Sequence, residues 1–203
     1  APLIAGGSAG SDHFTVPAFQ ISADGSRVVY LADQDTDGIP ELFRAPVDAS
    51  APAQRIHPPL AAGQGVNAFR LSPDGATVVY TAGELASGGL DIRLYAAPLD
   101  GSAPARVLTP PIAERPGVNS FELTADGSTA VYRASTLGEF RYELFTVPLD
   151  GGAPPTKLRG PLGPSGVSSF LLSPDGARAL YFTSGSLYVV PTDGSQPPLL
   201  LDD

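Results

Sequence analysis

The sequence repeats itself four times, and this repeat limits the chain to a small group of architectures. Four segments superimpose without a gap: 19–30 (FQISADGSRVVY), 69–80 (FRLSPDGATVVY), 121–132 (FELTADGSTAVY) and 170–181 (FLLSPDGARALY). Their shared aspartates, Asp24, Asp74, Asp126 and Asp175, are 50, 52 and 49 residues apart. A second motif follows in each unit, at 42–48, 94–101, 144–151 and 187–194. Four units that share two motifs in one order indicate a repeat protein.

Each unit predicts four short strands, A to D in chain order. Strand A is the apolar alternation that begins at the shared Phe, and an Asp-Gly turn leads into strand B, which is rich in β-branched and aromatic residues. Strand C is the second motif, and its Pro-x-Asp turn leads into strand D at 55–56, 106–108, 157–158 and 199–201. Repeated four-stranded units of about 50 residues predict an all-β fold, a β-propeller of four antiparallel blades, with a linear solenoid as the main alternative.

The repeat divides the chain into blades at 15–64, 65–116, 117–165 and 166–203, within a single propeller domain. Residues 1–14 precede the first complete unit, and part of them aligns with a strand D. This segment is either a flexible leader or a surplus outer strand that pairs outside the chain. In the second case the chain belongs to a larger ring, or copies of it assemble into one.

Composition excludes several classes of function. The 23 Gly and 22 Pro residues lie largely in the recurring turns, so they are not a sign of low complexity. Because there is no Cys, thiol chemistry and zinc–thiolate sites are excluded. The 12 Lys and Arg against 21 Asp and Glu give a net charge of −9, and the basic residues are scattered. We therefore expect neither nucleic acid nor membrane as a partner.

The motifs S-P-D-G, V-V-Y and L-Y-x-x-P-L-D-G resemble the PD40 (WD40-like) repeat of TolB-like propellers, over roughly residues 15–203. The resemblance implies an extracytoplasmic protein, periplasmic or secreted, of bacterial type. Similar blades form the propeller domains of prolyl-oligopeptidase-like and tricorn-like proteases. The resemblance therefore identifies the type of blade and leaves the activity open.

The loop between strands B and C of blade one has the strongest metal-binding pattern. Asp33, Asp35 and Asp37 alternate, Gly38 follows, and the carbonyl of Ile39 and the carboxylate of Glu41 complete a set of oxygen ligands. Hard cations prefer such ligands. The pattern predicts a structural Ca²⁺ site, and an acidic, solvated hairpin is the alternative.

We predict no catalytic residue. The four turn aspartates lie about one blade apart, too far for a catalytic carboxylate pair. Gly6 to Gly10 match G-x-S-x-G but lack the strand and helix of a nucleophile elbow. The two histidines, His13 and His57, cannot form a three-histidine metal site, and we expect His57 to be a solvated loop residue.

We therefore favour a binding function over a catalytic one. In a propeller the B–C and D–A loops surround the channel that is lined by strand A. At this end the repeats diverge in the residues that lead into strand A and at the second position of strand A. The candidate partner-binding residues are Gln20, Asn67, Arg70, Asn119 and Glu122. Leu172 is assigned to the second position of strand A in blade four. Sequence drift predicts the same divergence. The sequence favours a non-catalytic interaction or scaffold module that binds a protein or peptide; the alternatives are a self-assembling homo-oligomer that uses the N-terminal strand and the propeller part of a larger hydrolase.

Overall fold

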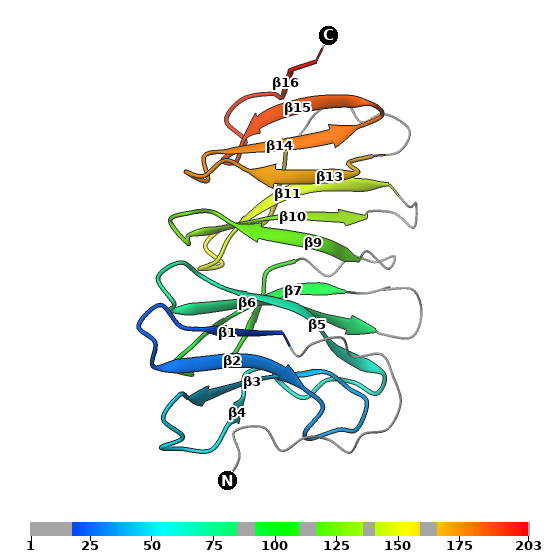
Figure 1. The fold of residues 1–203 in the computed structure, drawn as a ribbon. Coiled ribbons are helices and arrows are strands. Elements are labelled where there is room, and N and C mark those ends of the chain that lie inside the picture. The colour runs from blue at the N-terminus through cyan, green and yellow to red at the C-terminus, as the bar shows by residue number, and fades with distance from the viewer. Residues whose placement is uncertain (1–17, 85–91, 110–116, 136–140, 159–165, 203) are drawn as a thin grey trace. The chain divides into compact units, whose positions relative to one another are not determined.

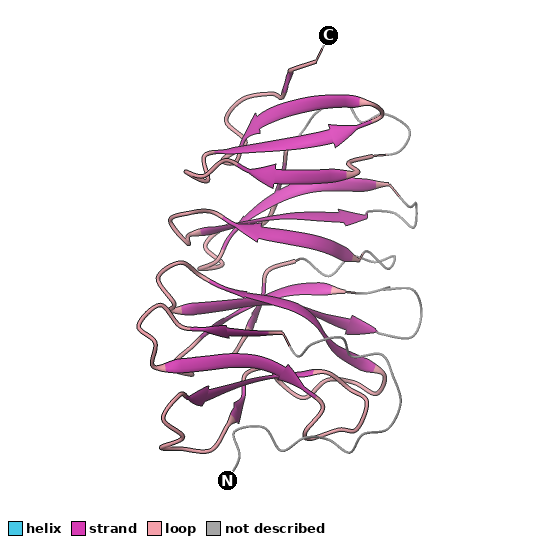
Figure 2. Cartoon of the chain, viewed as in Figure 1, coloured by secondary structure: helices cyan, strands magenta, loops and turns pink. Residues whose placement is uncertain are grey.

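The structure, a computed structural model, describes residues 18–84, 92–109, 117–135, 141–158 and 166–202. The regular elements in these ranges are all β-strands, joined by turns and loops (Figures 1 and 2). No helix in these ranges could span a membrane. The segment 1–14, predicted as a leader or surplus strand, lies outside the described residues, as does His13.

Each repeat forms one antiparallel sheet of four strands in chain order, which confirms the predicted strands. Blade one contains β1 (Phe19–Ile21), β2 (Arg27–Ala32), β3 (Glu41–Pro46) and β4 (Gln54–Arg55); blade two contains β5 (Gln64–Leu71), β6 (Thr77–Glu84), β7 (Arg93–Pro98) and β8 (Arg106–Val107). Blade three contains β9 (Val118–Leu123), β10 (Thr129–Ser135), β11 (Tyr142–Pro148) and β12 (Thr156–Lys157); blade four contains β13 (Ser169–Leu172), β14 (Arg178–Thr183), β15 (Ser186–Pro191) and β16 (Leu199–Leu200).

The chain divides into two compact units, which are described separately. The first comprises Ala1–Gly88 and Tyr95–Arg106, and it holds blade one and most of blade two. The second comprises Gly89–Leu94 and Val107–Asp203, and it holds blades three and four.

The turn between strands A and B is closed by its own side chains. In blade three the Thr124 hydroxyl donates to Asp126 Oδ1 at 2.6 Å, and the same oxygen accepts from the Ser128 amide at 3.1 Å. Ser22, Ser72 and Ser173 take the place of Thr124 in the other blades. These hydrogen bonds, chiefly that from Thr124, lower the pKa of Asp126 to about 2, and the Ser22 hydroxyl likewise lowers the pKa of Asp24 to about 2. The four aspartates therefore act in the turns, as predicted.

Strands B and C of every blade are joined by a stacked aromatic pair. The rings face each other across the two strands at centroid distances of 5.1 to 5.8 Å, in the pairs Tyr30–Phe43, Tyr80–Tyr95, Tyr132–Phe145 and Tyr181–Tyr188. Such pairs contribute beyond the area they bury. They fix the register of the central hairpin at the same point in each repeat.

Within each unit the two blades pack face to face. In the second unit, Val131, Leu144 and Leu158 of blade three form a core with side chains of blade four that include Ala179 and Tyr181. In the first unit, Val29 and Leu42 of blade one pack in the same way against blade two side chains that include Phe69 and Tyr80.

Backbone contacts repeat between consecutive blades as well. The Val66 amide donates to the Pro40 carbonyl at 2.8 Å, and the Val167 amide donates to the Tyr142 carbonyl at 2.7 Å. At the other end of the blades the Asp-Gly turns approach each other. A Cβ built on Gly176 would lie 2.6 Å from the backbone nitrogen of Ala125 in the preceding turn.

This contact predicts that two equivalent glycines differ in their tolerance of alanine. Gly25 and Gly176 both have a positive φ, +71° and +73°, but a Cβ on Gly25 would meet nothing within 4 Å. Gly25→Ala should lower the free energy of unfolding by about 1–2 kcal/mol, the cost of a left-handed alanine. Gly176→Ala should lower it by about 1–3 kcal/mol more, because the turns must separate. Denaturant titration measures both; equal losses would contradict the contact.

The turn hydrogen bonds predict a change in the pKa of Asp126. Thr124→Val should raise this pKa from about 2 toward the ordinary value of 3.8, whereas Thr124→Ser keeps the hydroxyl and should leave it low. Because the folded state favours the carboxylate, the stabilisation is present above about pH 4 and is lost as the pH falls toward about 2. A carboxyl NMR titration measures the pKa. An unchanged value in Thr124→Val would rule out the hydroxyl as its main cause.

Candidate functional site

Strand A carries a β-bulge in blades two and three, each time at an asparagine. Val66 pairs with Ala82 and Ala68 pairs with Thr81, so Asn67 is the extra residue. In blade three the pairs Val118–Ala134 and Ser120–Arg133 leave Asn119 as the extra residue. Both asparagines are exposed. Because a bulge re-aims a side chain locally and is frequent beside functional sites, it distinguishes these two predicted residues from their neighbours.

In the second unit Asn119 belongs to a polar cluster around Arg133. The guanidinium lies over the ring of Tyr142, 4.6 Å from its centroid, and donates to Asn119 Oδ1. It also donates to the Val167 carbonyl at 3.3 Å and to the Ser168 carbonyl. Its Nε is buried without a hydrogen-bond partner among the described residues, and burial lowers the pKa of the group.

This cluster presents hydrogen-bond donors at the loop end of blades three and four. Because Asn119 Oδ1 accepts from Arg133, the amide NH₂ of Asn119 is the group that is left to donate. The cluster therefore suits a ligand that offers carbonyl or carboxylate oxygens. Sequence reasoning missed Arg133, whose carbonyl partners come from the next blade, and Tyr142, whose ring the guanidinium covers.

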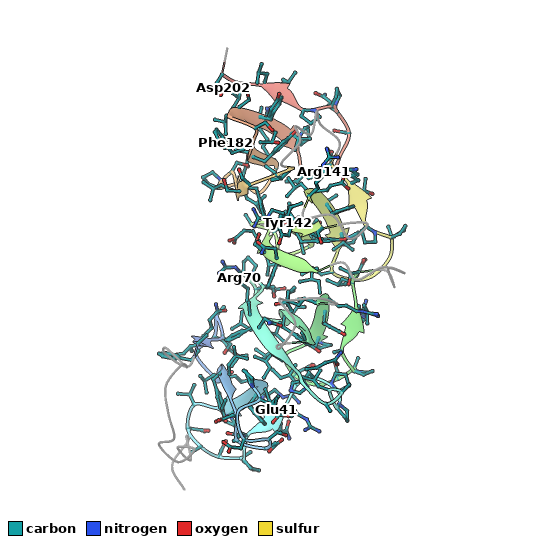
Figure 3. The ribbon with its side chains drawn as sticks, turned by 90° about the vertical axis from the view of Figure 1, so that its right-hand side faces the viewer. Glu41, Arg70, Arg141, Tyr142, Phe182 and Asp202 are labelled. Atoms are coloured by element: carbon teal, nitrogen blue, oxygen red, sulfur yellow. The ribbon has the colours of Figure 1, made fainter. Side chains whose placement is uncertain are left out.

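The second position of strand A has different roles in different blades. Gln20 is half-buried, and its Oε1 accepts from the Leu71 amide at 2.9 Å, so it joins blades one and two. Arg70, which is labelled in Figure 3, is exposed, and Glu122 is half-buried. The sequence assignment for blade four was wrong by one residue. Leu171 pairs with Leu180 as Gln20 pairs with Val29, so Leu171, not Leu172, occupies this position.

The predicted calcium loop is held by its own groups and by an arginine. Asp33 Oδ2 accepts from the Gly38 amide at 3.3 Å, and the Ile39 amide donates to the Thr36 carbonyl at 3.0 Å. Asp37 is exposed. Among the described residues no group of three or more His, Cys, Asp or Glu side chains is arranged to hold a metal ion. Calcium binding stays a prediction.

Arg55 occupies the position that a cation would take between two of the predicted ligands. Its Nη1 lies 3.4 Å from Asp35 Oδ2 and 3.3 Å from Glu41 Oε1. Glu41 is buried at the start of β3, and its Oε2 has no hydrogen-bond partner among the described residues (Figure 3). A calcium ion would have to displace this guanidinium.

The prediction that His57 is a solvated loop residue is wrong. The side chain is buried, with Nδ1 2.7 Å from the Pro58 carbonyl and Nε2 3.9 Å from Glu41 Oε1. Desolvation lowers the pKa of His57, so the ring is neutral at pH 7. The repeat carried a signal for this, because His57 follows strand D as the buried Thr109 does in blade two.

The fold places this chain among the β-propeller proteins. No protein-family model matches the sequence, and no curated protein does. Solved structures do match. A TolB-type protein of Agrobacterium tumefaciens superimposes with a TM-score of 0.57 at 16% identity, covering 91% of this chain and 64% of that one. A puromycin hydrolase gives 0.61 at 26% identity, with 89% and 29% covered, and dipeptidyl peptidase 4 of Porphyromonas gingivalis gives 0.69 at 10% identity, with 95% and 33% covered.

These matches confirm the predicted fold class, an all-β β-propeller of four-stranded antiparallel blades. The chain spans less than two thirds of each of the three proteins. They include enzymes as well as a TolB-type protein, so the likeness alone assigns no activity.

The position of Arg55 sharpens the calcium prediction. Calorimetric titration with Ca²⁺ should give heat that is stronger in Arg55→Gln, because the competing guanidinium is removed from Asp35 and Glu41. Asp35→Ala should weaken binding, since it removes one of the oxygen ligands. Absence of heat in both the wild type and Arg55→Gln would leave the loop as a solvated acidic hairpin.

Proposed function

We propose that the chain is a non-catalytic binding module that takes up a protein segment or peptide at the loop end of its blades. The observation that carries this proposal is the pair of bulges at Asn67 and Asn119. Blades two and three each have one extra residue at the same point of strand A, and in both blades this residue is an exposed asparagine. Drift at a tolerant position does not by itself account for a shared interruption of the sheet.

The Arg133 cluster supplies the chemistry of the proposed site in the second unit. A peptide backbone offers carbonyl oxygens at regular intervals, and the NH₂ of Asn119 is a donor for one of them. Arg133 holds Asn119 in place and adds positive charge, while its own position is fixed by the Tyr142 ring and by blade four carbonyls. Such preorganisation reduces the ordering cost of binding.

A screen with a displayed library of random linear peptides tests the proposal. Peptides selected on the wild type should bind Asn119→Asp about tenfold more weakly, because the aspartate still accepts from Arg133 but lacks the NH₂ donor. Gln196→Ala, an exposed change beyond strand C of blade four, is the control and should bind normally. Failure to enrich any peptide, or enriched peptides that ignore both Asn67→Ala and Asn119→Asp, would contradict the proposal.

The resemblance to TolB-like repeats supports an extracytoplasmic location for this module, and we include that location in the proposal. The second candidate is the propeller part of a larger hydrolase. The 26% identity to puromycin hydrolase, over 89% of this chain, favours it. The full reading frame decides between the two, because a hydrolase requires a catalytic segment in addition to the blades.

A further inference from the structure

The chain contains eight Asp-Gly dipeptides, and all of them lie within the described residues. Four close the turns between strands A and B, three close the turns between strands C and D, and one, Asp37-Gly38, lies in the loop between strands B and C of blade one. All eight aspartates are exposed, so access to water does not distinguish them. An Asp-Gly pair can close a five-membered succinimide ring, because glycine has no side chain to shield its nitrogen from the neighbouring carboxyl group.

The turns hold seven of these pairs in the same way. The amide two residues after each aspartate donates to its Oδ1 at 2.8 to 3.1 Å, as Ser26 does to Asp24. The glycine amide donates to the backbone carbonyl three residues before it at 2.8 to 3.3 Å, as Gly25 does to Ser22. Ring closure requires the carboxyl carbon and the glycine nitrogen to turn toward each other, so in these seven pairs both hydrogen bonds oppose it.

The eighth pair, Asp37-Gly38, lacks this arrangement. The amide two residues after Asp37 belongs to Ile39, and it donates to the Thr36 carbonyl at 3.0 Å instead of to the aspartate. Among the described residues the Asp37 carboxylate has no hydrogen-bond or ion-pair partner. The Gly38 amide donates at 3.3 Å to Oδ2 of Asp33, a side-chain acceptor that a change of rotamer releases. Both reacting groups of this pair are therefore free to approach each other.

We propose that Asp37 is a site of spontaneous covalent modification, isomerisation to isoaspartate through a succinimide with Gly38. The Gly38 nitrogen attacks Cγ of Asp37, the N–Cγ bond forms, and one carboxyl oxygen leaves as water with the amide proton and one proton from solvent. Water then opens the ring. Cleavage of the N–Cγ bond returns aspartate, and cleavage of the bond from the same nitrogen to the main-chain carbonyl carbon gives isoaspartate. The two steps release and consume one water molecule, so no other reagent is needed.

The product changes the loop that contains it. In isoaspartate the main chain runs through the side-chain carbon, so the loop gains one backbone atom and the carboxylate moves one carbon closer to the main chain. This loop leads to Pro40, whose carbonyl accepts from the Val66 amide in blade two. Isomerisation therefore alters the loop end of blade one next to the entry of strand A in blade two.

Peptide mapping of the aged, folded protein tests the proposal. Lys or Arg residues separate all eight dipeptides, so trypsin releases each in a peptide of its own. The whole chain is incubated at neutral pH in ¹⁸O-labelled water with a calcium chelator, and electron-transfer fragmentation then distinguishes isoaspartate from aspartate. Isoaspartate should form at Asp37 at least about tenfold faster than at the other seven sites, the effect of about one hydrogen bond to a charged group. In the chain unfolded by guanidinium, all eight sites should react at similar rates.

Two variants complete the test. Asp37→Glu keeps the charge but cannot close a five-membered ring, so it should abolish the signal from this peptide, which also contains Asp33 and Asp35. Ser22→Ala removes the hydroxyl that donates to Asp24 Oδ1 at 2.6 Å and should speed isomerisation at Asp24 while leaving Asp37 unchanged. Equal rates at Asp37 and Asp24 in the folded wild type would overturn the proposal. An excess at Asp37 that persists in the unfolded chain would overturn it too, because the local sequence and not the fold would then set the rate.

Discussion

A four-stranded blade has apolar side chains on both faces, so the structure depends on the contact between consecutive blades. Leu158 and Tyr181 belong to the core of one such contact, and Leu42 and Tyr80 belong to the equivalent core in the first unit. Burial of a large apolar side chain contributes about 1.5–3 kcal/mol. The contact also constrains the core positions of the repeat, which stay apolar from blade to blade, as at Leu42, Leu94 and Leu144.

The sequence predicts well what depends on local chemistry. The Asp-Gly turn closes with groups that lie within five residues of one another, from Thr124 to Thr129 in blade three. The alternation of the strands and the facing aromatic pairs follow from the turn, because a hairpin's register is set by its loop. Strand order and the length of each blade are therefore predictable from the repeat.

The candidate site is less predictable, because it depends on register and on neighbouring blades. A bulge changes the pairing of strand A by one residue, and nothing in the letters Val66-Asn67 or Val118-Asn119 specifies it. Whether the His57 side chain is solvated or buried, and therefore charged or neutral, depends on the path of the chain after β4. Arg133 finds its carbonyl partners 34 and 35 residues further along the chain. Contacts of this kind appear only when two blades are placed together.

Arg133 takes part both in the contact between blades three and four and in the candidate site. Its guanidinium requires the carbonyls of a following blade on one side, and it holds Asn119 on the other. Blade four has Phe182 at the same position. A buried guanidinium without partners is costly, whereas a phenyl ring gains from any apolar cover. The residue at this position therefore matches its surroundings: Arg133 meets backbone carbonyls in blade three, whereas Phe182 in blade four makes no such contact and is exposed.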